Sequence, residues 1–200
     1  MATVMKEIFS VSDINSRVNK TIDTIYLRRA VRKFIEKPLE RTMIEKVIDA
    51  GRMAPSAMNK QPCKFYVLSD KEIIMSFSKL IGKASFKGLV RMGAKGIAKA
   101  VASAILHPHE LSFYKGEDFV FHGAPVVIFI AAPKDNEWAA LDAGACMQNM
   151  MLAAKSFGID SCPVGLAKFV EDTEIYSTLK ISKNDQVLIA VILGYGNETP

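Results

Sequence analysis

Three arginines near residue 30 form a group that could bind an anion. Arg28, Arg29 and Arg32 fall within five residues, and a continued helical turn would place Arg28 and Arg32 on one side. Guanidinium groups bind phosphate through paired hydrogen bonds, and a phosphomonoester carries about −1.5 to −2 charge at neutral pH. The cluster therefore matches a phosphate group, although a solvated basic face at a helix end is the commoner explanation of such a run.

The segment 54–62, APSAMNKQP, has the composition of a loop. Two prolines stiffen it, and Ser56, Asn59 and Gln61 carry hydrogen-bonding groups of short reach. Together with backbone N–H groups, such side chains can bind the polar edge of a heterocycle without adding charge. An ordinary connection between two elements accounts for the same residues, so the composition leaves both interpretations open.

A further possible contact for a flat ligand is the turn Cys162, Pro163, Val164 and Gly165, which closes an expected strand. Gly165 would let the backbone approach such a ligand closely, because glycine has no side chain. A turn that only ends a strand is the more ordinary explanation of these residues. Taken alone, the turn therefore favours a structural role over a binding role.

Other motifs that carry chemistry are weak or missing. His107 and His109 could begin a metal site, but they stand beside a proline and no third ligand is placed. The patterns GxSxG, GxGxxG and GxxxxGK do not occur, so serine hydrolase, Rossmann dinucleotide and P-loop functions lose their main support. Cys63, Cys146 and Cys162 are an odd number without a CxxC pair, which indicates free thiols in a reducing cytoplasm.

Length and composition indicate a single globular domain over residues 1–200. The net charge of +5 suits an anionic small ligand as well as a nucleic acid, but the lysines are dispersed and no basic strand with interleaved aromatic residues occurs. We therefore expect no nucleic-acid partner. The longest uncharged stretch, 119–133, is shorter than the roughly 20 residues of a membrane-spanning helix. The N-terminus lacks the apolar core of a signal peptide, so we expect a cytoplasmic protein without membrane contact.

Hydrophobic patterning predicts an α+β sandwich, with helices on both faces of a small sheet. Residues 138–157 are apolar on nearly all sides, which is typical of a central helix, and Gly158 stands where a left-handed helix cap belongs. Residues 70–118 are expected to form a covering or lid region that contains two helices. Besides 138–157, the expected helices are 22–29, 73–80, 96–106 and 171–179, together with one helix that carries an apolar stripe over 43–48. The helices 73–80 and 96–106 belong to the covering region. The expected strands are 64–69, 125–131, 160–163 and 186–193.

Together, the segments resemble the nitroreductase family of FMN-dependent oxidoreductases over almost the whole chain. The matching segments are RRAVRKF from Arg28, then Pro38, AGRMAPSAMNKQPCKFYVLSD from Ala50, APVVIFIA from Ala124, DAGACMQNMMLAAKSFGIDSCPVG from Asp142, and the closing LIAVILGYGNETP. The arginine cluster followed by APSxxNxQP is the most distinctive part. The resemblance implies an α+β sandwich with a small mixed sheet, and an intertwined homodimer with two FMN sites at its interface.

The resemblance also implies roles for the three candidate segments. Arg28, Arg29 and Arg32 would hold the FMN phosphate and ribityl chain, with Ala30 standing where the family often has Ser. The residues that would approach the isoalloxazine from the other subunit belong to the loop: Pro55, Ser56, Ala57, Met58, Asn59 and Gln61. The residues that would line the ring near its reactive edge are Cys162, Pro163, Val164 and Gly165. Many relatives carry a further basic residue after a similar ending, which this sequence lacks before Pro200, so the phosphate would rest on the N-terminal arginines or on another basic side chain.

The implied activity is the transfer of reducing equivalents from NADH or NADPH, through FMN, to a nitroaromatic, a quinone or a similar small acceptor in a ping-pong cycle. The cofactor would carry the redox chemistry, so no side chain is assigned as a catalytic acid or base. The alternatives are a flavin-consuming or dehalogenating enzyme on the same scaffold, and a protein that binds FMN without catalysis.

Overall fold

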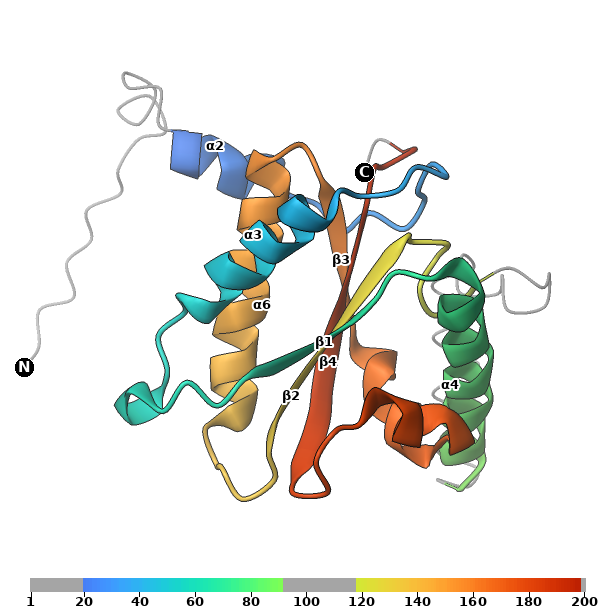
Figure 1. Ribbon diagram of the computed structural model, residues 1–200. Helices are drawn as coiled ribbons and strands as arrows, with labels where there is room; N and C mark the ends of the chain where they lie inside the picture. The colour runs from blue at the N-terminus through green and yellow to red at the C-terminus, as the bar shows by residue number, and fades with distance from the viewer. Residues whose placement is uncertain (1–19, 92–117, 199–200) are drawn as a thin grey trace, which may run out of the picture.

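A four-stranded antiparallel sheet lies between two layers of helices (Figure 1). The computed structural model describes residues 20–91 and 118–198. The strand order is β1-β2-β4-β3, with β1 (Lys64–Leu68), β2 (Val126–Pro133), β4 (Asp185–Gly194) and β3 (Asp160–Val164). The predicted α+β sandwich is confirmed. The named strands pair only in antiparallel fashion, and the parallel pairing that makes the sheet mixed is confined to a bridge between Ala30 and Ser161.

The two layers are built from different helices (Figure 1). In one layer α3 packs against α6, and in the other α4 packs against η3, which in turn contacts β4. The described helices are α2 (Lys20–Leu27), α3 (Arg41–Arg52), α4 (Lys71–Arg91) and α6 (Ala139–Ser156), with 3-10 helices η1 (Ala57–Asn59), η3 (Gly165–Asp172) and η4 (Glu174–Leu179). None of these helices combines the length and hydrophobicity that crossing a lipid bilayer would take.

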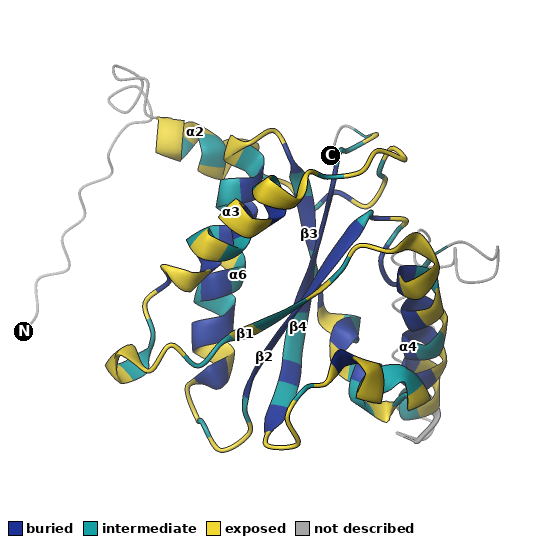
Figure 2. Ribbon diagram, viewed as in Figure 1, coloured by how far each residue is buried: buried dark blue, intermediate teal, exposed yellow. Residues whose placement is uncertain are grey.

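The central strand β2 shows why both faces of the sheet are covered. Its first seven residues are all buried, and successive side chains of a strand point to opposite faces. Phe129 and Ala131 join the core formed with α4, while Ile128 and Ile130 join the core formed with α3 and α6. The unbroken apolar run that predicted this strand is therefore the sequence of a strand buried on both sides, as Figure 2 shows.

The predicted central helix forms as α6 and ends as expected. Gly158 has φ of +73°, the left-handed conformation of a helix cap. Met150 and Ala154 are fully buried on the side facing α3 and the sheet, but Leu141 on the other side is 68% exposed (Figure 2). α6 therefore packs against the core on one side, while its apolar residues on the opposite side are exposed to solvent in a single chain.

The covering region begins as a long core helix. The expected helix 73–80 extends over α4, Lys71–Arg91, and continues through Gly82 and Gly88. Phe77 and Ile81 are buried at 1% and 0% exposure, so packing against the sheet and η3 outweighs the low helix propensity of glycine. The expected helix 96–106 and the rest of the covering region up to residue 117 lie outside the described residues.

The expected polar helix 171–179 is replaced by two 3-10 helices. They are separated at Thr173, whose backbone is extended with φ of −108° and ψ of 151°. The Thr173 hydroxyl donates to the Val170 carbonyl at 2.6 Å, and a threonine bonded in this way competes with a continuous helix.

Gly194, at the end of β4, is a position where a larger residue should destabilise the fold. A Cβ atom there would lie 2.6 Å from Phe34 Cδ1 and 2.8 Å from Pro125 Cδ, and neither ring can move aside freely. We expect Gly194→Ala to lower the free energy of unfolding by about 1–3 kcal/mol in denaturant titrations. Gly51→Ala is the control with a smaller expected loss, because its Cβ meets mainly the flexible Met150 side chain. An unchanged unfolding midpoint for Gly194→Ala would contradict this packing.

Candidate functional site

The arginine segment crosses β3, which brings two of the three predicted site segments together. Val31 N donates a hydrogen bond of 3.1 Å to Ser161 O, and Ala30 forms the parallel bridge with the same serine. The chain turns from α2 directly into this contact, because α2 ends at Leu27. Backbone hydrogen bonding therefore fixes residues 28–34 beside residues 162–165. The first three of these lie in β3, so the expected turn begins only at Gly165.

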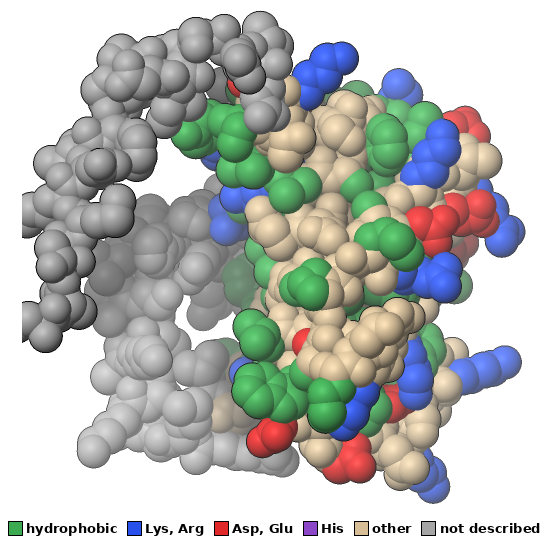
Figure 3. Space-filling view, turned by 90° about the vertical axis from the view of Figure 1, so that its left-hand side faces the viewer, with side chains coloured by type: hydrophobic (Ala, Val, Ile, Leu, Met, Phe, Trp, Pro, Cys, Tyr) green, Lys and Arg blue, Asp and Glu red, His purple; other side chains and the backbone are tan. Residues whose placement is uncertain are grey.

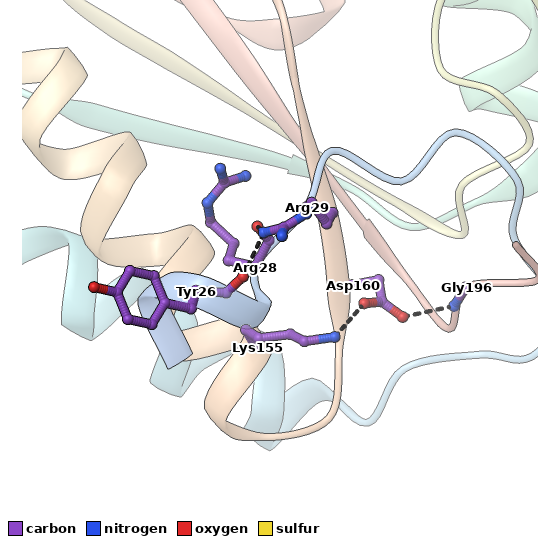
Figure 4. Close-up of polar contacts among 6 residues, drawn as sticks. All are labelled: Tyr26, Arg28, Arg29, Lys155, Asp160 and Gly196. Carbon is purple, nitrogen blue, oxygen red and sulfur yellow. Dashed lines mark hydrogen bonds and ion pairs between the residues drawn. The ribbon is translucent and has the colours of Figure 1, made fainter. Parts of the chain in front are cut away.

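The three arginines differ in what their side chains contact, and Figure 4 shows two of them, Arg28 and Arg29. The Arg29 guanidinium turns back on the end of α2, where Nη1 donates to the carbonyl oxygens of Tyr26 and, at 2.9 Å, of Arg28. A cation at this place satisfies free carbonyl groups and interacts favourably with the helix dipole. Within residues 20–91 and 118–198, no hydrogen bond or ion pair engages the guanidinium groups of Arg28 and Arg32. These two side chains are therefore the ones free to hold an anion.

The charges of Arg28 and Arg32 also reach the thiol of Cys162. Burial raises the pKa of this thiol, and the two guanidinium groups oppose that rise. Because burial prevails, the thiol stays protonated at neutral pH. At Gly165, nothing lies within 4 Å of the position that a Cβ would take. Gly165 thus offers an open position close to the guanidinium groups of Arg28 and Arg32 and to the carboxylate of Glu198, whose charge adds to the rise of the Cys162 pKa.

Two carboxylates that sequence reasoning missed, Asp160 and Glu198, hold residues 195–198 beside the arginines, and Figure 4 shows the contacts of Asp160. The Arg32 N–H donates to Glu198, while Asp160 accepts from Gly196 N at 3.1 Å and pairs with Lys155 Nζ at 3.0 Å. A Cβ at Gly196 would stand 2.7 Å from the Asp160 carboxylate, so the close approach requires glycine. No spacing signals the two backbone contacts, because their partners are 166 and 36 residues apart.

The loop 54–62 folds around η1 into a strained turn. Met58, Asn59 and Gln61 have φ of 52°, 53° and 47°, a region that residues with side chains rarely adopt. Ser56 Oγ accepts from Gln61 N at 2.9 Å, and Gln61 Nε2 donates to Asn59 Oδ1 at 3.0 Å. The side chains of Asn59 and Gln61, which were predicted to bind a heterocycle, therefore bind each other in this chain, while that of Ser56 binds the Gln61 backbone and helps to hold the strained turn in shape.

Asp142 anchors this loop to the first turn of α6. Its Oδ1 accepts a hydrogen bond of 3.1 Å from Ala57 N, and the residue is only 4% exposed. Its Oδ2 is buried and has no hydrogen-bond partner in the described part of the chain. Sequence reasoning did not select Asp142, although an acidic residue alone in an otherwise apolar helix is a usable signal, because a buried charge needs a partner.

The loop does not meet the other two segments within one chain. Asp142 holds the loop at the start of α6, whereas Lys155, at the other end, pairs with Asp160 beside the arginine segment (Figure 1). An α-helix rises 1.5 Å per residue, so the two places are about 20 Å apart. The structure thus joins the arginines to residues 162–165 and leaves the loop at a separate position.

The donor set suits an anionic, flat ligand rather than a metal ion. Arg28 and Arg32 offer forked cationic donors, and Gly165 leaves space beside the buried, protonated Cys162. No group of three or more His, Cys, Asp or Glu side chains that could hold a metal occurs among the residues described. His107 and His109 lie outside them.

Comparison with known proteins decides the family of this chain. The model of the family described as "Nitroreductase family" matches residues 25–195, which span the arginine segment, the loop, α6 and all four strands. The chain belongs to the nitroreductase family. The family predicted from the sequence is confirmed, and with it an oxidoreductase activity.

Three similar proteins illustrate how far the likeness extends. A 4-nitrobenzoate reductase from Pseudomonas putida is 32% identical over 193 residues, which cover 86% of this nitroreductase and 83% of the relative. An FMN reductase (NAD(P)H) from Bacillus subtilis strain 168 is 22% identical and matches 89% of this chain and 66% of its own. The crystal structure of a nitroreductase with bound FMN from Desulfitobacterium hafniense DCB-2 superposes with a TM-score of 0.74 at 22% identity, covering 92% of this chain and 93% of the other.

Removal of the Asp142 carboxylate should loosen the loop of this nitroreductase. A hydrogen bond to a charged group contributes about 1.5–3 kcal/mol, so we expect Asp142→Ala to speed amide hydrogen exchange at Ala57 by about 10-fold or more. Asp142→Asn is the control that keeps an acceptor oxygen and should exchange more slowly than the alanine variant. Equal exchange rates at Ala57 in the parent and in Asp142→Ala would show that the carboxylate does not hold the loop.

Proposed function

We propose that this nitroreductase binds FMN and passes reducing equivalents from NAD(P)H to a nitroaromatic, a quinone or a similar small acceptor. The observation that carries the proposal is the pair of unengaged guanidinium groups, Arg28 and Arg32, beside the open turn at Gly165. Their two positive charges match a phosphomonoester, and the turn leaves room for a flat ring. The FMN in the names of a relative and of a structural neighbour supports the same cofactor.

In the proposed mechanism the chain binds and orients, while FMN when bound supplies the hydride chemistry. Arg28 and Arg32 hold the phosphate, and the hydrogen bond from Val31 to Ser161 fixes that phosphate relative to residues 162–165. The protonated thiol of Cys162 presents a neutral wall to the ring. No described side chain is assigned a proton transfer, so binding and positioning are the contribution of the protein.

Reductant and acceptor use one site in turn, which is a ping-pong cycle. The name of the Pseudomonas putida relative, 4-nitrobenzoate reductase, favours a nitroaromatic as acceptor. An anaerobic absorbance spectrum tests the activity directly: the purified protein should be yellow, bleach with NADH or NADPH, and regain its colour when a nitroaromatic is added. Bound flavin that is not reduced by either nucleotide would point instead to a binding protein without catalysis.

The proposed site is completed by a second copy of the chain. A two-fold dimer with α6 against its mate brings the loop of one chain toward the arginines of the other, across the separation of about 20 Å. The surface that would be buried is apolar: Trp138 and Leu141, at the start of α6, are 45% and 68% exposed. Figure 3 shows hydrophobic side chains in several patches on the side of the molecule that carries α3 and α6. An exposed apolar face of this kind marks a contact surface.

The phosphate assignment predicts a loss of cofactor when the two free arginines are removed. Each phosphate contact is worth about 1.5–3 kcal/mol, so Arg28→Ala and Arg32→Ala should each raise the Kd for FMN about 10- to 100-fold, and the double variant should purify nearly colourless. Arg41→Ala is the matched control, because Arg41 is an exposed arginine of α3 whose ion pair, within the described part of the chain, is with Glu45. Flavin fluorescence titration measures the Kd for FMN of the parent and of each variant. A double variant as yellow as the parent would refute the assignment.

The dimer predicts that an acidic substitution on α6 will separate the chains and release the cofactor without unfolding them. A buried, unpaired carboxylate is costly at an apolar contact, so we expect Leu141→Glu to sediment as a monomer and to lose most of its FMN while keeping its circular dichroism spectrum. Ile73→Glu is the control, since Ile73 is 46% exposed on α4, in the opposite layer. A dimeric, yellow Leu141→Glu variant would contradict the assembly.

A further inference from the structure

Two of the three cysteines share a small cavity on the loop side of the molecule. Cys63 directly precedes β1, and Cys146 lies in the middle of α6; both line a cavity of about 240 Å³ together with Asp142. Ser56, Gln61 and Arg52 complete its polar lining. All three cysteines are reduced, but Cys162 belongs to the core on the opposite face of the sheet. Only Cys63 and Cys146 are therefore placed to react with one another.

The two thiols are electrostatically unequal. A side-chain hydrogen bond with Cys146, followed by burial, raises the pKa of Cys63. The same hydrogen bond lowers the pKa of Cys146, against burial and against the negative charge of Asp142, which both act to raise it. The thiolate is the nucleophilic form of cysteine. The hydrogen bond therefore favours a thiolate on Cys146 over one on Cys63, although Cys63 is the more exposed of the two thiols.

We propose that Cys146 and Cys63 are a peroxide-reactive pair that closes to a reversible disulfide between α6 and the start of β1. In the first step the Cys146 thiolate attacks one oxygen of a hydroperoxide. The O–O bond breaks, the leaving alkoxide or hydroxide takes a proton, and Cys146 becomes a sulfenic acid. In the second step the Cys63 sulfur gives up its proton and attacks the Cys146 sulfur, the S–O bond breaks, and water leaves. Two thiols are oxidised by two electrons and the peroxide is reduced by two.

The disulfide would give the loop a second anchor on α6. In the reduced protein the loop is tied to this helix through the hydrogen bond from Ala57 to Asp142. Cys146 follows Asp142 by one helical turn, and Cys63 follows the last residue of the loop. Oxidation therefore fixes both ends of a strained segment to the same face of one helix. Any effect on flavin binding rests on the function proposed above, whereas formation of the bond does not.

The test is a thiol map of the full-length protein after exposure to hydrogen peroxide. The reduced, folded protein is treated with a small molar excess of hydrogen peroxide, denatured in N-ethylmaleimide, digested without reductant and analysed by mass spectrometry. We expect a linked peptide that joins Cys63 to Cys146, its disappearance after dithiothreitol, and loss of both residues from the alkylated pool. Cys162 should remain alkylated. A Cys162→Ser variant is the matched control and should give the same linked peptide.

Single variants test the order of the two steps. In C63S the sulfenic acid on Cys146 has no neighbour to resolve it and should be trapped by dimedone, whereas C146S should show little dimedone adduct on Cys63. The proposal is overturned if the parent, still folded by circular dichroism, gives no peptide linking 63 to 146, or if the link joins Cys162 or a second chain. A linked peptide in a preparation that never binds FMN would support the thiol pair while refuting the proposed function, so the two failures are distinguishable.

Discussion

The length of α6 is the physical constraint on which the candidate site depends. The helix holds the loop 54–62 at its first turn and leads into β3 after its last, so two parts of a site are kept about 20 Å apart. Local adjustment cannot shorten this distance, because α6 is packed between α3 and the sheet and Met150 is fully buried. In the proposed dimer the same rigid helix sets the distance between the two flavin sites.

Much of the fold could be predicted because it follows from hydrophobic pattern and local backbone preference. The apolar runs of β2 and β4, the apolar helix α6 and the left-handed cap at Gly158 are properties of short segments, and each was recognised within a few residues. One error has a tertiary cause and the other a local one. α4 continues through its glycines because the burial of Ile81 and Phe77 outweighs helix propensity, whereas the helix expected over 171–179 is broken because the Thr173 hydroxyl bonds the Val170 carbonyl three residues before it.

The candidate site was predictable as a set of segments but not as a set of contacts. The three arginines look alike in the sequence but differ in the structure, where Arg29 caps α2 while the charges of Arg28 and Arg32 act on the Cys162 thiol. The anchors Asp142 and Glu198 were missed because each acts on a backbone group far away in sequence. Left-handed backbone at Met58 and Asn59 was also beyond prediction, since neither residue type favours it strongly enough to signal it.

The arginine segment also determines when during synthesis a binding site can exist. Its backbone partners include Ser161 and Glu198, and the contact of Arg32 with Glu198 joins residues 166 positions apart. A ribosome synthesises the chain from its N-terminus, so the arginine segment emerges early. Its long-range partners Ser161 and Glu198 follow only when almost the entire domain has been made. Contacts of such long range form late in folding. On the proposed function, cofactor capture then follows synthesis of the domain through residue 198, and a cell depleted of riboflavin would accumulate the folded domain without cofactor.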